Sequence, residues 1–338
     1  MKKIIVIGMG SIGQRHLHIS ANVFPSAKIY SLGCRPYVHT PNDLKHSFKD
    51  RHKGVTILET IADIYPLKPD AVIIASPSSE HMVYVETLLK HNIPCLVEKP
   101  LSDNVKKAKQ QLTLMQSNKI ALGYTFRFSR LLNQCKEIIN SNQYGKIIHA
   151  SIHTNQYLPD WRPKCDYRLS VSAQKKLGGG VLLELSHEID IIIWLMGSVE
   201  SVCAGVSSSK TLDVDVEDTV DALLKLNSGA TVNLHLDMMQ RVPSRRYLIA
   251  FERGSIAIDM IAQTLSRCSG NSRIWDQEHI PQSRDEIFSD QLLEFSNYIK
   301  GGVWSGASIE EGLHTLNIIE SIHLSSRDGI WSRVNYAG

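Results

Sequence analysis

The first thirteen residues constrain the fold of this chain more than any other segment of the sequence. The apolar run Ile4–Ile7 leads directly into Gly8-Met9-Gly10-Ser11-Ile12-Gly13, which matches the pattern G-x-G-x-x-G. In a buried strand followed by a helix, Gly8 permits the tight turn, Gly10 lets a pyrophosphate approach the backbone and Gly13 lets the helix pack closely on the strand. The helix N-terminus at Ser11 and Ile12 then offers N–H groups to the phosphates. The pattern predicts a dinucleotide site, and a tight turn without a ligand is the alternative.

Short apolar runs alternate with amphipathic stretches from Lys3 to Gly123. Strands that are apolar throughout, with helices between them, are typical of a parallel sheet covered on both faces. This half therefore has the pattern of a Rossmann-type, doubly wound α/β domain. The predicted strands are Ile4–Ile7, Lys28–Leu32, Ala71–Ala75, Ile93–Val97 and Ile120–Leu122, and the predicted helices are Ile12–Ala21, Glu80–His91 and Asn104–Gln116.

The pattern changes after Gly123, where strands with alternating polar and apolar residues follow one another across short turns. Such spacing predicts an α+β domain with a large, open, mainly antiparallel sheet. Residues 1–123 are predicted to be the dinucleotide-binding domain, and residues 124–338 the substrate-binding and oligomerisation domain. The predicted strands are Ile147–Gln156, Ser198–Ser208, Thr219–Leu226, Ala230–Met238, Arg246–Phe251 and Ser255–Asp259, and the helices are Leu131–Ser141, Val181–Leu195, Asp285–Lys300 and Ile309–Ser325.

Charge and composition exclude several classes of function. The net charge of +3 over 338 residues gives no electrostatic reason to expect a nucleic acid or a membrane surface as partner. No apolar run reaches the ~18–20 residues of a membrane helix. The six cysteines are dispersed without a C-x-x-C pair, which favours reduced thiols in the cytoplasm and no metal site.

The end of the second predicted strand bears on the choice of nucleotide. An NAD site usually carries an acidic residue there, whereas the stretch Tyr30–Pro36 has none and contains Arg35. A guanidinium group suits a 2′-phosphate, so the sequence favours NADP over NAD, unless Arg35 is an ordinary surface residue. The turn after the strand Ala71–Ala75 places Ser76, Pro77 and His81 beside the expected cofactor. Capping of the next helix is enough to explain the hydroxyl groups of Ser78 or Ser79 in the same turn.

Two further motifs suggest catalytic groups. Glu98-Lys99-Pro100 follows a predicted strand at the edge where open α/β sheets bind ligands. Lys99 could bind a substrate hydroxyl and stabilise negative charge on its oxygen, and a surface ion pair is the alternative. In the apolar segment Val181–Leu195, the side chains of Glu184, His187 and Asp190 are spaced by three and would share one side of a helix.

An imidazole beside carboxylates suits general acid–base chemistry near neutral pH. His187 is therefore a candidate catalytic residue, with Glu184 as its partner or as the base itself. A histidine satisfied within the core and a structural zinc ligand are the alternatives. No cysteine or second histidine lies at ligand spacing, which disfavours zinc.

The segment from Tyr157 to Arg168 is rich in rings and guanidinium groups. Tyr157 and Trp161 could stack on a sugar ring, while Arg162 and Arg168 could bind a carboxylate or phosphate bidentately. A structural or interface loop is the alternative. The open sheet that follows needs a cover for one face, which predicts a homodimer or homotetramer through that sheet.

In combination, these motifs resemble the Gfo/Idh/MocA family, the relatives of glucose–fructose oxidoreductase and inositol dehydrogenase. The resemblance rests on the glycine fingerprint, Glu98-Lys99-Pro100, Gly123-Tyr124 with Arg127-Phe128, and the glycine-rich helix with His187 and Asp190. It implies NAD(P)-dependent oxidation or reduction of sugars and their derivatives. Within the family, the chain resembles a subgroup associated with surface-polysaccharide sugars.

The resemblance also implies roles for single residues. Glu98 and Lys99 would contribute to the cofactor site, Lys99 would contact the reacting hydroxyl, His187 would act as acid–base, and Arg127 and Asp190 would contact substrate. Many relatives carry an aspartate four residues before the histidine. Leu183 stands there in this chain and Glu184 follows it.

Three functions remain open at this point. The leading one is hydride transfer between a nicotinamide and a hydroxyl or keto carbon of a sugar. The second is a lyase or hydrolase that oxidises a glycoside transiently with a retained nucleotide. The third is a non-enzymatic nucleotide sensor, which would not require Lys99 and His187.

Overall fold

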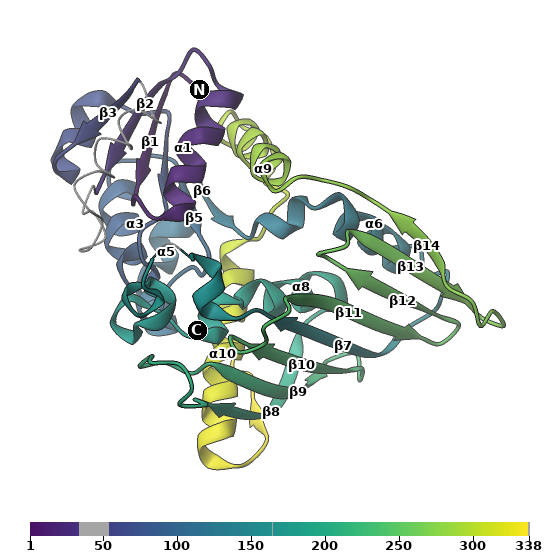
Figure 1. Cartoon of the computed structure of the whole chain (residues 1–338). Coiled ribbons are helices and arrows are strands. Elements are labelled where there is room, and N and C mark those ends of the chain that lie inside the picture. The colour runs from purple at the N-terminus through teal and green to yellow at the C-terminus, as the bar shows by residue number, and fades with distance from the viewer. Residues whose placement is uncertain (34–53, 164, 337–338) are drawn as a thin grey trace. The chain divides into compact units, whose positions relative to one another are not determined.

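The computed structural model describes residues 1–33, 54–163 and 165–336, which fold into two compact units (Figure 1). Met1–Thr125 and Arg284–Gly312 form the first unit, and Phe126–Ser283 and Leu313–Gly338 form the second. The predicted division, which gives everything after residue 123 to the second domain, is therefore corrected. Helix α9 (Arg284–Ile299) belongs to the first unit because its apolar side chains are part of the core of that unit.

The first unit is built on a six-stranded sheet in the order β3-β2-β1-β4-β5-β6, and all of its strand pairs are parallel. Every residue of β4, β5 and β6 is buried, as expected for strands covered on both faces. The doubly wound parallel sheet is thus confirmed, and the short edge strand β3 is an addition to the predicted set. The strands are β1 Lys3–Ile7, β2 Lys28–Leu32, β3 Val55–Leu58, β4 Ala71–Ile74, β5 Cys95–Glu98 and β6 Ile120–Gly123.

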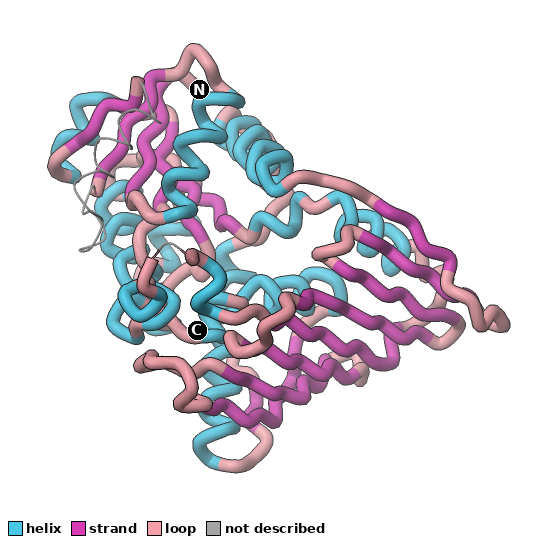
Figure 2. The backbone as a smooth tube through the Cα atoms, in the orientation of Figure 1, coloured by secondary structure: helices cyan, strands magenta, loops and turns pink. Residues whose placement is uncertain are grey.

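Helices pack against this sheet, and the strand side chains that they contact alternate along each strand. Helix α1 (Ser11–Val23) and helix α9 share a core with Ile4, Val6 and Ile73, whereas α3 (His81–Leu89) packs on β5. The helix predicted over Asn104–Gln116 is interrupted at Gln111 and forms α4 (Val105–Gln110) and α5 (Leu112–Gln116). Figure 2 shows this alternation of strands and helices along the chain.

The second unit contains a nine-stranded sheet in the order β14-β13-β12-β11-β7-β10-β9-β8-β15. Only the pair β7 and β10 is parallel among its described neighbours, so the predicted large, mainly antiparallel sheet is confirmed. The strands are β7 Ile147–Asn155, β8 Val199–Ser207, β9 Thr219–Leu226, β10 Thr231–Asp237, β11 Ser244–Phe251, β12 Gly254–Asp259, β13 Thr264–Ser269, β14 Asp276–His279 and β15 Ser332–Arg333.

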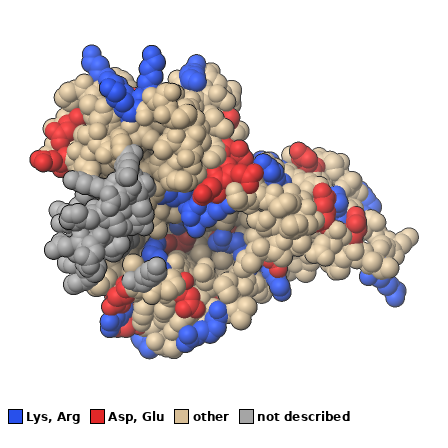
Figure 3. All heavy atoms as spheres, turned by 45° about the horizontal axis from the view of Figure 1, so that its top comes forward, with Lys and Arg blue, Asp and Glu red and all other residues tan. Residues whose placement is uncertain are grey.

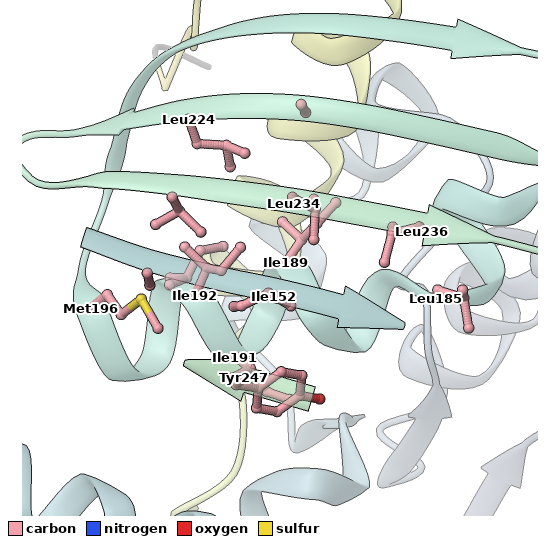
Figure 4. Packing of buried hydrophobic residues seen from close by; sticks show 14 of the residues in the cluster. Ile152, Leu185, Ile189, Ile191, Ile192, Met196, Leu224, Leu234, Leu236 and Tyr247 are labelled. Atoms are coloured by element: carbon pink, nitrogen blue, oxygen red, sulfur yellow. The ribbon is translucent and has the colours of Figure 1, made fainter. Parts of the chain in front are cut away.

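One face of this sheet is buried under helices and the other is exposed. Side chains of α6 (Arg130–Asn140), α8 (Ser186–Met196) and the later part of α10 (Ile309–Asp328) form one apolar cluster with the strands. Figure 4 shows Ile189 and Ile192 of α8 beside Ile152 and Leu234 of the strands. On the opposite face, Leu223 is 38% exposed. Among the described helices, none is long and apolar enough to cross a membrane.

Candidate active site

The turn between β1 and α1 has the backbone geometry of a phosphate cradle. Gly8 has a φ of 97°, and a Cβ atom placed on it would overlap the carbonyl oxygen of Ala75 at the end of β4. A Cβ on Gly13 would overlap the carbonyl oxygen of Gly8. Helix α1 begins at Ser11 after Gly10, which has no side chain to cap it. The residues therefore fit a pyrophosphate held by backbone N–H groups, with Ile12 in the first turn.

Glu98 ends β5 and its carboxylate turns toward α1. Its Oε1 lies 2.7 Å from Nε2 of His16, and both residues are buried. Its Oε2 accepts a hydrogen bond of 3.3 Å from the backbone N–H of Lys99. Lys99, which is half-buried, thus follows a residue that a buried contact holds in place. The predicted cofactor contact of Glu98 stays a prediction, and its contact in this structure is with His16.

The loop after β4 is connected to the loop after β5 by His81. One ring nitrogen of His81, Nδ1, lies 2.9 Å from the carbonyl oxygen of Pro100, and Nε2 lies 3.0 Å from that of Ser76. Burial lowers the pKa of His81, against the effect of these carbonyl groups. Ser76 and Pro77 are half-buried beside the β1–α1 turn, whereas the ring of His81 is enclosed between the two loops.

The predicted nucleotide-discriminating residue, Arg35, lies outside the described residues.

Metal binding was not predicted from the sequence, and the described part of the chain contains no group of three or more His, Cys, Asp or Glu side chains suited to hold an ion. Basic and acidic side chains are interspersed on the face drawn in Figure 3.

The continuous helix predicted over Val181–Leu195 is wrong. Helix α7 (Val181–Glu184) ends before Leu185, whose φ of −100° and ψ of 26° leave the helical region, and α8 starts at Ser186. Glu184 therefore lies on a different helix from His187. His187 is half-buried, and its ring packs on that of Phe126 with 4.5 Å between the centroids.

Arg127 and Asp190 bind each other within the second unit. The guanidinium Nε and Nη2 donate to the two carboxylate oxygens over 3.1 and 2.7 Å. The side chains are 3% and 1% exposed, so the pair lies in the interior. This bidentate contact connects the turn that precedes α6 to α8. The predicted substrate contacts of these two residues stay predictions.

The segment from Tyr157 to Arg168 is held by contacts within the second unit. Nε1 of Trp161 donates to the carbonyl oxygen of Gln156 over 3.1 Å, and the guanidinium of Arg241 lies 3.6 Å from the centre of the Tyr157 ring. Arg168 makes a bidentate contact with Asp166, whereas Arg162 is half-buried.

Sequence reasoning missed three side chains that contact the predicted residues, one in the first unit and two in the second. His16 faces Glu98, Arg241 covers Tyr157, and Arg245 lies over the ring of Phe126. The position of His16 on the buried face of α1, three residues after Gly13, is a signal that could have been used. The two arginines lie far from their partners in sequence and carried no comparable signal.

Two family models match the chain. The Oxidoreductase family with an NAD-binding Rossmann fold, GFO/IDH/MocA, matches residues 2–126, and the GFO/IDH/MocA C-terminal domain matches residues 132–257. The chain is 23% identical over 264 residues to a UDP-N-acetylglucosamine 3-dehydrogenase of Acidithiobacillus ferrooxidans, a match that covers 77% of this chain and 74% of that protein.

Solved structures share the fold over almost the whole chain. A levoglucosan dehydrogenase in complex with NADH and levoglucosan superposes with a TM-score of 0.85 at 18% identity, covering 99% of this chain and 100% of that one. The WlbA dehydrogenase of Bordetella pertussis, in complex with NADH and UDP-GlcNAcA, gives a TM-score of 0.78 at 19% identity, covering 99% of both chains.

The buried Arg127–Asp190 pair predicts a large loss of stability when one partner is removed. Replacing Arg127 by Met removes the guanidinium that faces the buried Asp190 carboxylate, which costs about 3–5 kcal/mol of unfolding free energy. Arg168→Met is the matched control, because it breaks a bidentate pair whose arginine is 54% exposed, and exposed pairs contribute little to stability. Urea unfolding of both variants measures the difference, and equal losses would contradict this account of the pair.

Proposed function

Because the chain belongs to the Gfo/Idh/MocA family of oxidoreductases, we propose that it transfers hydride between a nicotinamide nucleotide and a carbon bearing a hydroxyl or keto group in a sugar or sugar derivative. The observation that carries this proposal is the β1–α1 turn, where backbone from β4 approaches Gly8 too closely for any side chain. Such a turn at a helix N-terminus suits a dinucleotide. The levoglucosan and UDP-sugar relatives support a sugar as the second substrate.

Lys99 and His187 carry the proposed chemistry. A bound nicotinamide supplies or takes up the hydride. The ammonium group of Lys99 donates a hydrogen bond to the reacting oxygen and stabilises negative charge on it. The imidazole of His187 takes the hydroxyl proton during oxidation and returns it during reduction. Glu184 is proposed to act on His187 or as an additional base, although it lies on a separate short helix.

The substrate is proposed to be a sugar that bears an anionic group, such as a carboxylate or a nucleotide diphosphate. Two of the related proteins are named for, or were solved with, UDP-linked sugars. Tyr157, Trp161, Arg162 and Arg168 gather rings and guanidinium groups in one segment that suits such a molecule. Arg168 is paired with Asp166, so its proposed share of anion binding is the smaller one.

A homodimer or homotetramer through the uncovered face of the nine-stranded sheet is also proposed. Leu223 and Leu248 are 38% and 44% exposed on that face of the single chain. A cytoplasmic location is proposed from the dispersed cysteines, and the described ones are free thiols.

If Lys99 and His187 have these catalytic roles, their substitution should lower turnover without lowering the affinity for the nucleotide. Purified protein is first assayed with a panel of sugars, sugar acids and nucleotide sugars, following NAD(P)H by absorbance. Lys99→Ala and His187→Ala are each expected to lower kcat by ~10²–10⁴ because each removes a group that acts on the reacting oxygen or its proton. NADH binding, measured by fluorescence, should remain nearly unchanged.

Lys90→Ala, which removes an exposed lysine from the first unit, is the control for that experiment and should turn over normally. Full activity in His187→Ala would remove His187 from the mechanism. A product formed without net change of nucleotide, with retained NAD, would instead favour the lyase or hydrolase. Nucleotide binding without turnover of any compound would favour the sensor.

Arg35 predicts a preference for the phosphorylated nucleotide. The NAD-binding family and the NADH complexes of related structures support NAD(H), and a modest preference for NADP(H) is our proposal. Arg35→Ala is expected to shift the ratio of NADPH to NADH affinity toward NADH by roughly tenfold, because a charge-assisted hydrogen bond is lost. Fluorescence titration measures both affinities, with Lys28→Ala as an exposed control. An unchanged ratio would show that Arg35 does not contact the nucleotide.

Substitution of the two arginines of the Tyr157–Arg168 segment should raise the Michaelis constant by different amounts. Arg162→Ala is expected to raise KM for an anionic substrate by roughly ten- to a hundredfold, in line with the loss of a charge-assisted hydrogen bond. Arg168→Ala should raise it less, since Asp166 and Asp213 already face that guanidinium. A neutral analogue should be little affected by either change. Equal losses for anionic and neutral compounds would show that these arginines hold the segment together instead.

A further inference from the structure

The imidazole of His187 is the end of a chain of contacts inside the second unit. The ring of Phe126 packs on it at 4.5 Å between centroids, with the two planes inclined by 41°. The guanidinium carbon of Arg245, from β11, lies 4.7 Å from the centre of the Phe126 ring. Phe126 therefore contacts both the proposed acid–base residue and a cation that no part of the proposed mechanism uses.

Arg245 forms an ion pair with a buried carboxylate. Its Nε lies 2.8 Å from Oε1 of Glu188, a contact that lacks hydrogen-bond geometry; Glu188 has no exposed surface, and the Arg245 side chain is largely buried. The same oxygen accepts hydrogen bonds from Oγ1 of Thr154 over 2.9 Å and from the hydroxyl of Tyr247 over 3.2 Å. Burial, reinforced by the neighbouring Glu188, raises the pKa of Tyr247 well above its ordinary value, so its hydroxyl remains a donor.

The contacts form a closed path, because Glu188 directly follows His187 on α8. The path runs from the backbone of α8 through the carboxylate of Glu188 to Arg245 and Phe126, and returns to the imidazole of His187. The backbone of α8 sets the direction of the Cα–Cβ bond of His187 but not its side-chain torsions, so the helix alone does not fix the orientation of the ring. A side chain contacted in this way loses rotamer freedom before the substrate binds.

Stability alone does not account for a charged pair at this place. Buried ion pairs are often no more stabilising than apolar side chains of the same size. The second oxygen of Glu188, Oε2, is buried and receives no hydrogen bond from a described residue. An aromatic ring placed between the cation and His187 adds a specific orientation that an apolar cluster would not require.

We propose that Arg245 is a positioning residue for the reaction: anchored by Glu188, it holds the ring of Phe126, which in turn sets the orientation of the His187 imidazole. The two nitrogens of an imidazole are chemically distinct, so rotation of the ring changes which of them faces the substrate. This inference rests on the role proposed above for His187. It adds two residues, Arg245 and Phe126, that act through His187 and need no contact with substrate.

The test removes the charges together, so that no unpaired buried ion remains. In the double variant Arg245→Met/Glu188→Gln, the amide oxygen at position 188 can still accept from Thr154 and Tyr247. We expect kcat to fall roughly ten- to a hundredfold, as for a misplaced catalytic group, while KM and NADH affinity change less than about twofold. Phe126→Leu should also lower kcat with little change in KM or NADH affinity. Phe126→Tyr, which keeps the ring, should retain most of the wild-type kcat.

A spectroscopic readout keeps the proposal independent of turnover. The Hε1 resonance of His187, assigned by its loss in His187→Gln, feels the ring current of Phe126. It should move in Phe126→Leu and in the double variant. Arg246→Met is the matched control, since Arg246 is the next residue of β11, its side chain is 72% exposed and it pairs with Asp259. That variant should leave both the resonance and kcat unchanged.

The outcomes separate the two proposals. An unmoved resonance together with unchanged kcat in the folded double variant would overturn the positioning role of Arg245. A fall in stability with kcat and the resonance preserved would also overturn it, because the network would then be structural. If the wild-type protein converts no compound of the sugar panel, that result counts against the proposed function, and the resonance decides the positioning inference.

Discussion

The close backbone approach between β1, α1 and β4 is the constraint on which the first unit depends. No side chain fits at Gly8, because its Cβ would occupy the space of the neighbouring strand's carbonyl oxygen. This approach fixes the path of α1, and α1 brings His16 to the carboxylate of Glu98 at the end of β5. Glu98 in turn receives the N–H of Lys99. The turn that fits a pyrophosphate is thus connected, through α1 and His16, to the residue that precedes the proposed catalytic lysine.

Buried charge plays the corresponding part in the second unit. Helix α8 carries two carboxylates into the interior, and each meets an arginine from another element: Asp190 meets Arg127, and Glu188 meets Arg245. Removing such charges from water is costly, and the contacts stabilise the fold only when their geometry is good. They therefore tie α8 to two separate parts of the unit. His187 therefore lies at the start of a helix that two ion pairs connect to other parts of the unit.

The fold is shared with dehydrogenases whose sequences are only 18–19% identical to this chain. A shared fold does not fix the substrate, which depends on the side chains of the site. The Tyr157–Arg168 segment, which we propose to contact the substrate, carries exposed polar groups. Its internal contact between Arg168 and Asp166 shows that part of its charge maintains the segment itself. The ring of Tyr157 is likewise covered from within the unit, by Arg241.

The sequence by itself determined the β1–α1 turn, the parallel sheet, the antiparallel sheet and the position of Lys99 at a strand end, because these follow from local spacing of glycines and apolar residues. Local spacing could not show that α9 returns to the first unit, nor that Leu185 interrupts the helix before His187. It also could not pair His16 with Glu98, 82 residues apart, or Arg127 with Asp190, 63 residues apart. Only the tertiary structure decided these contacts, because a buried charge is satisfied by whichever partner the packing of distant elements brings within hydrogen-bond distance.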